Sequence, residues 1–336
     1  PKGGFMPGGI FRVAIAVLAA GFVAQPAAPA YAQPAPADSF PNKPVRIIVP
    51  FAVGGPTDFL ARLIGHKLSQ LWNQPVLVDN KPGAGANIGT DAVAKAAADG
   101  YTMGIVSNAY TINPSLYSKL PFDTVNDFAP ITKLGDATLL LVAHPSVPAK
   151  DIRELIALDK AKPGTLAYGT SGIGGTPHLV GELLNQRMGT NFVHVPYKGG
   201  GQAMIDVIGG QIPLVFTAVA SAQQHVKSGK VIGIGVTSAR RSTSLPDVPT
   251  FAEGGLADFV VDSWVGILAP TRTPRSVIEK LQREIAEVLR DPSLRDRYAT
   301  LGIEPVGNTP EQFGAQIRAD LARWEKVVKQ AGIRVE

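Results

Sequence analysis

The chain has 336 residues, of which 45% are hydrophobic and 18% are charged, so it can bury the cores of two domains. It contains no cysteine, which excludes disulfides, cysteine-ligated zinc, iron–sulfur clusters and cysteine nucleophiles. The net charge is +5, but the basic residues are dispersed and form no run or stripe, which argues against nucleic-acid binding. The five histidines lie far apart in the sequence, and we expect neither a metal site nor a cofactor.

Residues 1–40 carry the pattern of an export signal. Lys2 and Arg12 precede an apolar stretch over 13–24, and Ala30-Tyr31-Ala32 is typical of a cleavage site. A stretch of that length is too short for a transmembrane helix, which needs roughly 20 residues. We predict a signal peptide over 1–32, cleaved after about Ala32, and a disordered spacer over 33–40; the alternative is an amphipathic or buried helix. No later segment is typical of a membrane span, so we expect an exported, soluble, periplasmic protein.

The next hundred residues alternate between strand and helix patterns. The run "VRIIVPF" (45–51) is almost continuously apolar, as expected for a strand that is covered on both faces. After Gly54-Gly55, apolar residues recur with the helical period from Phe59 to Leu71. A strand over 76–78, a glycine-rich turn over 81–89, a helix over 90–98 and a strand over 101–107 follow. This alternation predicts a parallel, doubly wound α/β sheet.

The pattern restarts after a long apolar run, "ATLLLVAHP" (137–145). We expect strands over 166–170, 192–195, 212–216 and 231–237, and helices over 152–160, 177–188, 202–208 and 220–228. Residues 240–262 are rich in turn formers and predict a loop. A strand over 263–270 precedes three helices over 274–289, 293–301 and 310–331, the last with Thr309 as its N-cap.

This order of elements predicts two α/β lobes. If the runs near 138–143 and 263–269 both cross between lobes, then lobe 1 comprises 41–141 and 263–336, and lobe 2, inserted into it, comprises 142–262. We favour this arrangement because the last helices need a sheet to pack against. The alternative is two sequential domains with a helical tail.

Two stretches repeat one design: "GGPTDFLARLIG" (54–65) and "GGTPHLVGELLN" (174–185). In each, a buried strand ends, glycines turn the chain and a helix begins. A helix N-terminus presents unpaired N–H groups and roughly half a positive charge, so it suits a carboxylate or phosphate. We expect Thr57 or Asp58 to cap the first helix, and Thr176 to cap the second with Pro177 at its first position. The alternative is that each is simply a tight β–α turn.

Six stretches in order give the chain a resemblance to the solute receptors of tripartite tricarboxylate transporters, the Bug/TctC-type periplasmic binding proteins. They are "PVRIIVPFAVGGPTD", "NKPGAGANIGTDAVAKAAADGYTM", "YGTSGIGGTPHL", "VPYKGGGQAMIDVIGGQI", "RRSTSLPDVPTFAEGG" and "SWVGILAPTRTP". The resemblance covers residues 41–336. It implies a two-lobed periplasmic-binding-protein fold of the type II, Venus-flytrap class, which holds a small organic carboxylate between its lobes and delivers it to a membrane permease. We expect a monomer.

The resemblance also implies the ligand-binding residues. In lobe 1 they are Phe51, Gly54, Gly55, Pro56, Thr57, Asp58, Ser107 and Asn108; in lobe 2 they are Thr170, Ser171, Gly175, Thr176, His178 and Thr217. Tyr197 is a further candidate for the cleft wall. Each polar candidate has a structural alternative: Asp58 as a helix cap, His178 as a packed residue at a helix start, Ser107 and Asn108 as turn formers, and Tyr197 packed beneath its loop. Val53 departs from the family, which commonly has proline there.

Other functions are less well supported by the residues. A hydrolase would use Ser171 and His178 with Asp206 or Asp262, but "GTSGI" (169–173) lacks the last glycine of a nucleophile elbow, so we expect no enzyme. A dinucleotide site at Gly83-x-Gly85 lacks the correct spacing and an acidic partner. A ligand-sensing receptor without transport remains an alternative. The sequence leaves open whether the ligand is a dicarboxylate, a tricarboxylate, an amino acid or an aromatic acid.

Overall fold

The computed structural model describes residues 40–334, so the predicted signal peptide and nearly all of the predicted spacer lie outside the described residues. Phe40, the last residue of that spacer, is instead part of the core. It is only 5% exposed, and its ring packs edge-on against Tyr101 and Trp72, with centroids 4.8 and 6.4 Å away. Ordered structure therefore begins at least one residue earlier than predicted.

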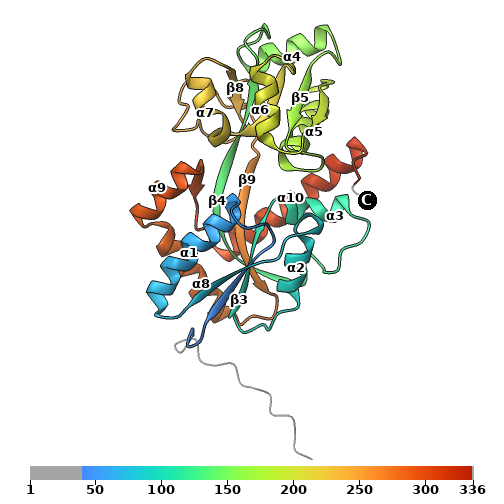
Figure 1. Ribbon diagram of the computed structural model, residues 1–336. Coiled ribbons are helices and arrows are strands. Elements are labelled where there is room, and N and C mark those ends of the chain that lie inside the picture. The colour runs from blue at the N-terminus through green and yellow to red at the C-terminus, as the bar shows by residue number, and fades with distance from the viewer. Residues whose placement is uncertain (1–39, 335–336) are drawn as a thin grey trace, which may run out of the picture. The chain divides into compact units, whose positions relative to one another are not determined.

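The first lobe is built on a mixed sheet (Figure 1). Three strands run parallel in the order β2-β1-β3, and β9 joins β3 in the antiparallel direction. Buried side chains of β1 alternate little, because helices cover both faces of the sheet. The elements are β1 (Val45–Val49), α1 (Pro56–Trp72), β2 (Val76–Asn80), η2 (Ala84–Ala86), α2 (Asn87–Ala94), β3 (Thr102–Ser107), α3 (Ala109–Leu116), β9 (Asp262–Pro270) and α8 (Arg275–Leu289).

The second lobe repeats this plan with three parallel strands in the order β7-β5-β6. Helix α5 packs on one face of the sheet with Tyr168 and Phe216, and α6 packs on the other with Val142 and Val215. The elements are α4 (Ile152–Ala161), β5 (Ala167–Thr170), α5 (Thr176–Met188), β6 (Val193–Pro196), α6 (Gly200–Ile208), β7 (Leu214–Ala218), α7 (Val219–Lys227) and β8 (Ile232–Val236).

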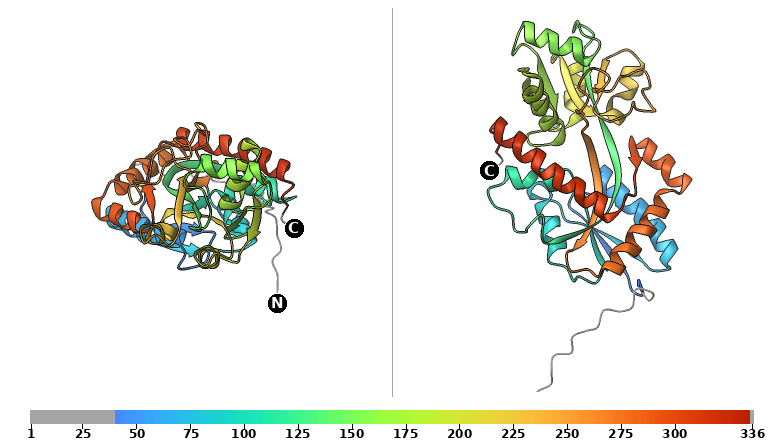
Figure 2. Two further views of the ribbon diagram at one scale, coloured as in Figure 1. Left: turned by 90° about the horizontal axis from the view of Figure 1, so that it is seen from above. Right: turned by 180° about the vertical axis from the view of Figure 1, so that it is seen from behind.

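One long strand, β4 (Phe128–Ala143), belongs to both sheets. Its first part pairs with β9 and its last part pairs with β7 and β8, always antiparallel (Figures 1 and 2). We predicted only its second half, because Pro130, Lys133 and Gly135 weaken the strand pattern of the first half. The sheets are therefore mixed: the parallel β–α units of the prediction are present, but antiparallel strands join them.

The pairing registers show where the carboxyl ends of the parallel strands lie. Ser107, the last residue of β3, pairs with Val265 near the start of β9, where the chain returns from the second lobe. Ala218, the last residue of β7, pairs with Leu139, where β4 has just entered that lobe. The carboxyl edges of both sheets therefore face the crossing of β4 and β9 near Thr138 and Asp262.

The C-terminal elements are α9 (Pro292–Thr300), the short strand β10 (Ile303–Pro305) and α10 (Pro310–Ala331). The predicted cap of α10 is confirmed: Thr309 accepts from the Gln312 N–H, and the Gln312 side chain accepts from the Thr309 N–H. Helix α10 also contacts α5, since Gln186 donates to the Val327 carbonyl at 3.0 Å. Because α10 packs on elements of both lobes, the exact lobe boundaries stay a prediction. Helix α3 and strand β10 were not predicted.

Asn108 ties the return strand β9 to the end of β3. Its side-chain oxygen accepts from the Trp264 N–H at 2.7 Å, and its amide group donates to the Asp262 carbonyl at 3.3 Å. We expect Asn108→Ala to lower the free energy of unfolding by about 1–3 kcal/mol, because it leaves the buried Trp264 N–H without an acceptor. Urea titration against the exposed control Asn126→Ala checks this; equal losses in the two variants would contradict it.

Candidate ligand-binding site

The two glycine loops have the same backbone conformation. Gly54 and Gly174 have positive φ angles of 87° and 76°, which favour glycine. The next glycine is the N-cap in each case, with φ and ψ of −77° and 167° at Gly55 and of −73° and 161° at Gly175. The repeated sequence design is thus a repeated structure, placed once at the carboxyl edge of each sheet.

Each loop is closed by the side chain four residues after its first glycine. The Gly54 N–H donates to Asp58 Oδ2 at 2.9 Å, and the Gly174 N–H donates to His178 Nδ1 at 3.0 Å. This corrects the predicted caps. Neither Thr57 nor Thr176 occupies the N-cap position, and Thr176, rather than Pro177, is the first helical residue. The glycine N-caps leave the helix ends open.

Asp58 is fixed by a network that the sequence did not reveal. Arg62 forms an ion pair with Asp58 Oδ1 at 2.9 Å, and Asn80, at the end of β2, donates to the same oxygen and to the Phe51 carbonyl. Burial acts to raise the pKa of Asp58, but the bonds from Arg62, Gly54 and Asn80 outweigh it and hold the pKa below its ordinary value. The sequence does contain one signal of this network: Asp58 and Arg62 are four residues apart, the spacing of an ion pair along a helix.

His178 is fixed by a second network, within lobe 2. Its ring stacks on the His194 ring, with centroids 3.7 Å apart, and His194 Nε2 lies 2.7 Å from the Thr170 hydroxyl. Its own Nε2 is 3.9 Å from a Glu182 oxygen, again one helical turn along. Burial lowers the pKa of each histidine to about 4, and for His178 the neighbouring His194 adds to the effect. His178 is therefore neutral near pH 7, as its acceptor role at Nδ1 requires.

Several predicted residues use their side chains for structure. Asn108 holds β9, and the Ser107 hydroxyl accepts weakly from the Ala109 N–H at 3.4 Å. The Tyr197 hydroxyl donates to Asp206 at 2.7 Å, so this ring is held beneath its loop. Ser171 is exposed, and His178 is already engaged by the Gly174 amide. The structure therefore shows no Ser171–His178 pair of the kind a hydrolase needs.

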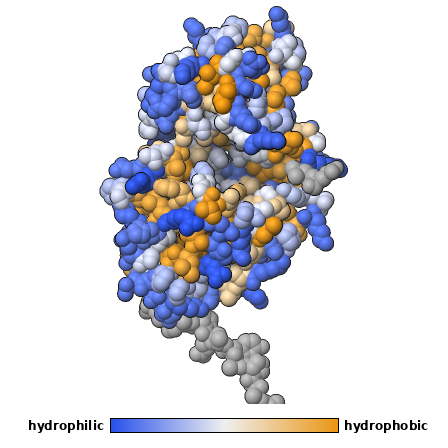
Figure 3. All heavy atoms as spheres, in the orientation of Figure 1, coloured by the Kyte–Doolittle hydropathy of each residue, from blue (hydrophilic) through white to orange (hydrophobic). Residues whose placement is uncertain are grey.

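Backbone N–H groups remain open at both helix ends. The first helical turns leave the amides of Gly55, Thr57 and Asp58 in one loop, and of Gly175, Thr176 and His178 in the other, without an acceptor in residues 40–334. Figure 3 shows a hollow in the molecular surface between the elements of lobe 1 and those of lobe 2. Open amides at a helix N-terminus are the groups that bind carboxylates in proteins.

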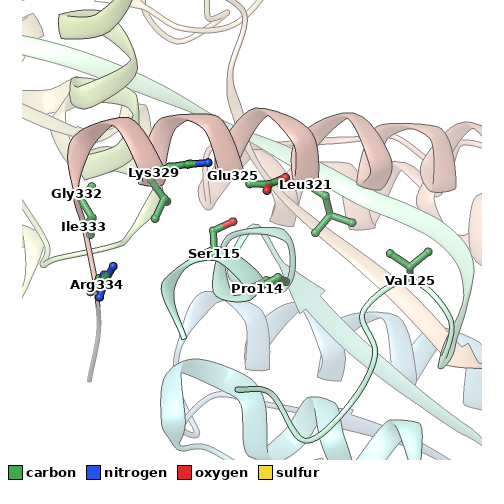
Figure 4. Close-up of a pocket in the computed structure, with 10 residues that line it drawn as sticks. Pro114, Ser115, Val125, Leu321, Glu325, Lys329, Gly332, Ile333 and Arg334 are labelled. Carbon is green, nitrogen blue, oxygen red and sulfur yellow. The ribbon is translucent and has the colours of Figure 1, made fainter. Parts of the chain in front are cut away.

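Among the depressions that lie away from the glycine loops, two border α10. A groove of about 500 Å³ runs between α3 and the end of α10 and is lined by Pro114, Val125, Leu321 and Ile333 among others (Figure 4). A smaller one, of about 250 Å³, lies at the crossing of the strands beside Asn108 and Asp262. Apart from Asn108, neither contains a predicted ligand residue. Within the described residues, no cluster of acidic or histidine side chains is arranged to bind a metal ion.

Comparison with known proteins identifies the family. Residues 60–333 match the family model described as "Tripartite tricarboxylate transporter family receptor". The chain belongs to this receptor family. It is 37% identical to the protein BugT of Bordetella pertussis over 307 residues, which is 91% of this chain and 94% of BugT. None of the helices between Phe40 and Arg334 has the long apolar stretch that a membrane span requires.

Solved structures agree with this assignment. The receptor superposes with a TM-score of 0.73 on Rpa4515 of R. palustris, a structure with adipate, at 33% identity over 88% of this chain and all of that one. It superposes with a TM-score of 0.69 on MatC of Rhodopseudomonas palustris, a structure with bound malate. The two are 31% identical, and the match covers 86% of this chain and all of that one. The predicted fold class, a two-lobed α/β periplasmic binding protein, is confirmed.

The histidine stack makes the stability of the receptor depend on pH. The folded-state pKa of His178 and His194 is about 4, below the ordinary value of 6.5, so the unfolded chain binds more protons between these values. Stability is therefore retained above about pH 6.5 and falls as the pH drops toward 4, by at most about 1.4 kcal/mol per pH unit for each histidine.

Urea unfolding of wild type, His178→Gln and the exposed control His66→Gln at about pH 7 and about pH 4.5 measures this slope. We expect the slope to flatten in His178→Gln and to persist in His66→Gln. The same slope in all three proteins would contradict the attribution of the pH dependence to the histidine stack.

Proposed function

We propose that this receptor captures a small organic carboxylate between its two lobes in the periplasm and delivers it to the membrane permease of a tripartite tricarboxylate-type transporter. The observation that carries the proposal is the matched pair of glycine loops. They have one backbone conformation, they sit at carboxyl edges that face the same crossing, and they leave six amides open. Such a pair supplies hydrogen bonds and positive potential to a negatively charged ligand from two sides.

The residues divide into two roles. The amides of Gly55, Thr57, Gly175 and Thr176 face the ligand, whereas Asp58 and His178 hold the loops in shape. This division is supported by burial: Asp58 is 2% exposed and His178 is 5% exposed, and the atoms that close the loops, Asp58 Oδ2 and His178 Nδ1, are already bonded within the protein. The remaining predicted residues, Phe51, Gly54, Pro56, Ser107, Asn108, Thr170, Ser171, Tyr197 and Thr217, form or support the surrounding wall.

Ligand contacts to both loops favour the closed arrangement of the lobes. A ligand that binds the closed form more tightly than the open form shifts the population toward it. Strands β4 and β9 are the connections that bend. The bound adipate and malate of Rpa4515 and MatC support a carboxylate as the ligand class. The proposal needs no catalysis and no cofactor, and we place the receptor in the periplasm because its structural relatives are periplasmic binding proteins.

A thermal-shift screen of the mature receptor against organic acids tests the ligand class. A carboxylate present at about 100 times its dissociation constant should add about 2.7 kcal/mol to the free energy of unfolding. Matched amides or esters of the same acids should add nothing, because they lack the charge that the helix ends attract. Stabilisation by neutral compounds alone would contradict the proposal.

Thr176 separates the role of the backbone from that of the side chain. Thr176→Pro removes one open N–H at the first helical position, where proline is well tolerated, and Gly175 already has the extended conformation that precedes proline. Thr176→Ala removes the hydroxyl and the methyl group of the side chain but keeps the N–H. We expect Thr176→Pro to weaken carboxylate binding by roughly 10- to 100-fold, the worth of one hydrogen bond to a charged group.

Isothermal titration calorimetry of Thr176→Pro, Thr176→Ala and wild type with one carboxylate decides the point. Binding by Thr176→Ala should stay close to that of wild type. Equal binding by the proline and alanine variants, with unchanged melting temperatures, would show that this amide does not hold the ligand.

A further inference from the structure

Five charged side chains gather where β4 and β9 cross between the lobes (Figure 1). Four of them line the depression of about 250 Å³ beside α10. The members of this crossing cluster are the acids Asp136, Asp262 and Asp320 and the bases Lys133 and Arg323. With all five side chains ionised, three negative charges face two positive charges, so one negative charge is uncompensated.

Asp262 is the acid of the crossing cluster that lacks a partner. The Lys133 amine lies 2.7 Å from Asp136 Oδ2, and the Arg323 guanidinium lies 3.7 Å from Asp320 Oδ1. Within residues 40–334, Asp262 forms no such pair, and its buried Oδ1 atom has no hydrogen-bond partner. A buried carboxylate without a partner is costly, so this group favours the neutral, protonated form.

The pairing register places a second buried oxygen beside Asp262. Asp136 pairs with Trp264 and Thr138 pairs with Asp262, so the two acids are diagonal neighbours on one face of the β4–β9 pair. Helix α10 covers this face, since Asp320 accepts from the Trp264 indole N–H at 2.8 Å. The Oδ1 atom of Asp136 is also buried, and no donor in the described part of the chain reaches it. A proton held here supplies a hydrogen-bond donor where two carboxyl groups otherwise offer only acceptors.

These surroundings make Asp262 titrate near neutral pH. Burial raises the pKa of Asp262 to about 7, and the negative charge of Asp136 adds to this effect. Lys133 and Arg323 act in the opposite direction, and Asp320 acts with Asp136. The histidine stack has pKa values of about 4, so it is already neutral where Asp262 exchanges its proton.

Asp262 also adjoins the wall of the proposed ligand site. Its backbone carbonyl accepts from the Asn108 side chain at 3.3 Å, and the carboxyl edges of both sheets face the crossing at Thr138 and Asp262. A ligand held by the two glycine loops brings its negative charge to this crossing. Because like charges disfavour each other's ionised form, the ligand and ionised Asp262 oppose one another.

We propose that the receptor takes up a proton at the crossing cluster when it binds a carboxylate, and that Asp262 is the group that receives it. This inference rests on the proposed function, which places the ligand between the glycine loops. The charge of the bound ligand raises the pKa of Asp262, and by linkage ionised Asp262 weakens ligand binding to the same extent. Affinity is therefore highest below about pH 7 and falls as the pH rises through the pKa of Asp262.

Calorimetry in buffers of different ionisation enthalpy counts the protons that are exchanged on binding. The ligands are adipate, malate and every organic acid that stabilises the mature receptor in the thermal-shift screen, at about pH 7.5, where such acids are ionised. We expect an uptake of roughly a quarter to a half of a proton per ligand. Affinity should fall about 2- to 6-fold between about pH 6.5 and about pH 8.5. Both values correspond to a rise of about half a unit to one unit in the pKa of Asp262.

Three variants identify the group that takes up the proton. Asp262→Asn resembles the protonated acid at every pH, so it should exchange no proton and bind equally well at both ends of this range. Asp258→Asn changes an exposed aspartate four residues earlier and should behave like wild type. Arg323→Gln removes a positive charge from the crossing cluster, so it should move the decrease in affinity to higher pH. This shift remains informative even if Asp262→Asn lowers the melting temperature.

The outcomes separate the two proposals. Carboxylate binding without proton uptake, equal uptake by wild type and Asp262→Asn, or an unshifted pH profile in Arg323→Gln would refute the proton coupling and leave the glycine-loop site standing. If no organic acid binds at any pH, the proposed function fails and the coupling fails with it.

Discussion

The bond between the first glycine amide of each loop and the side chain four residues later sets the shape of the site. It joins Gly54 to Asp58 and Gly174 to His178. The first glycine then has a positive φ angle, and the second stands at the N-cap without a capping side chain. An ordinary serine or aspartate N-cap would bond to the amides of the first turn and fill the helix end. Here the acceptor lies four residues after the first glycine and bonds to that glycine's N–H instead. The amides of the first helical turn therefore stay free for a ligand.

The two lobes close their loops with side chains of opposite chemical type. In lobe 1 an acid, Asp58, is backed by a base, Arg62, and in lobe 2 an imidazole, His178, is backed by an acid, Glu182. In both lobes the second residue of the pair lies one helical turn after the residue that closes the loop. The Asp58–Arg62 pair places little net charge beside the first loop, and neutral His178 places none beside the second. Neither closing group therefore opposes a negative ligand with an uncompensated charge.

Much of this arrangement was predictable from the sequence, because apolar periodicity and glycine turns are local signals. The alternation of strands and helices, the cap at Thr309 and the two glycine loops follow from such patterns. The first half of β4 did not, since Pro130, Lys133 and Gly135 form a strand only through pairing with a distant segment, β9. The roles of Asn80 and His194 were equally hidden, because each acts across neighbouring strands. Sequence spacing also placed the caps too late, by two or three residues in the first loop and by one in the second: Gly55 and Gly175 themselves occupy the N-cap positions.

The crossing of β4 and β9 connects these local features to a closing motion. Both carboxyl edges face the crossing, so the closing motion proposed above is a rotation about it that brings the two glycine loops together. The pairing of β4 shifts register between Lys133 and Gly135 on one side of the crossing and between Leu141 and Val142 on the other. A bulge interrupts the ladder of hydrogen bonds and lets a strand bend locally. Between them lies a regular segment in which Asp136 and Thr138 pair with Trp264 and Asp262. The irregular pairing of β4 thus favours these positions for the proposed bending, while Asn108 anchors β9 to the end of β3 on the lobe 1 side of the crossing.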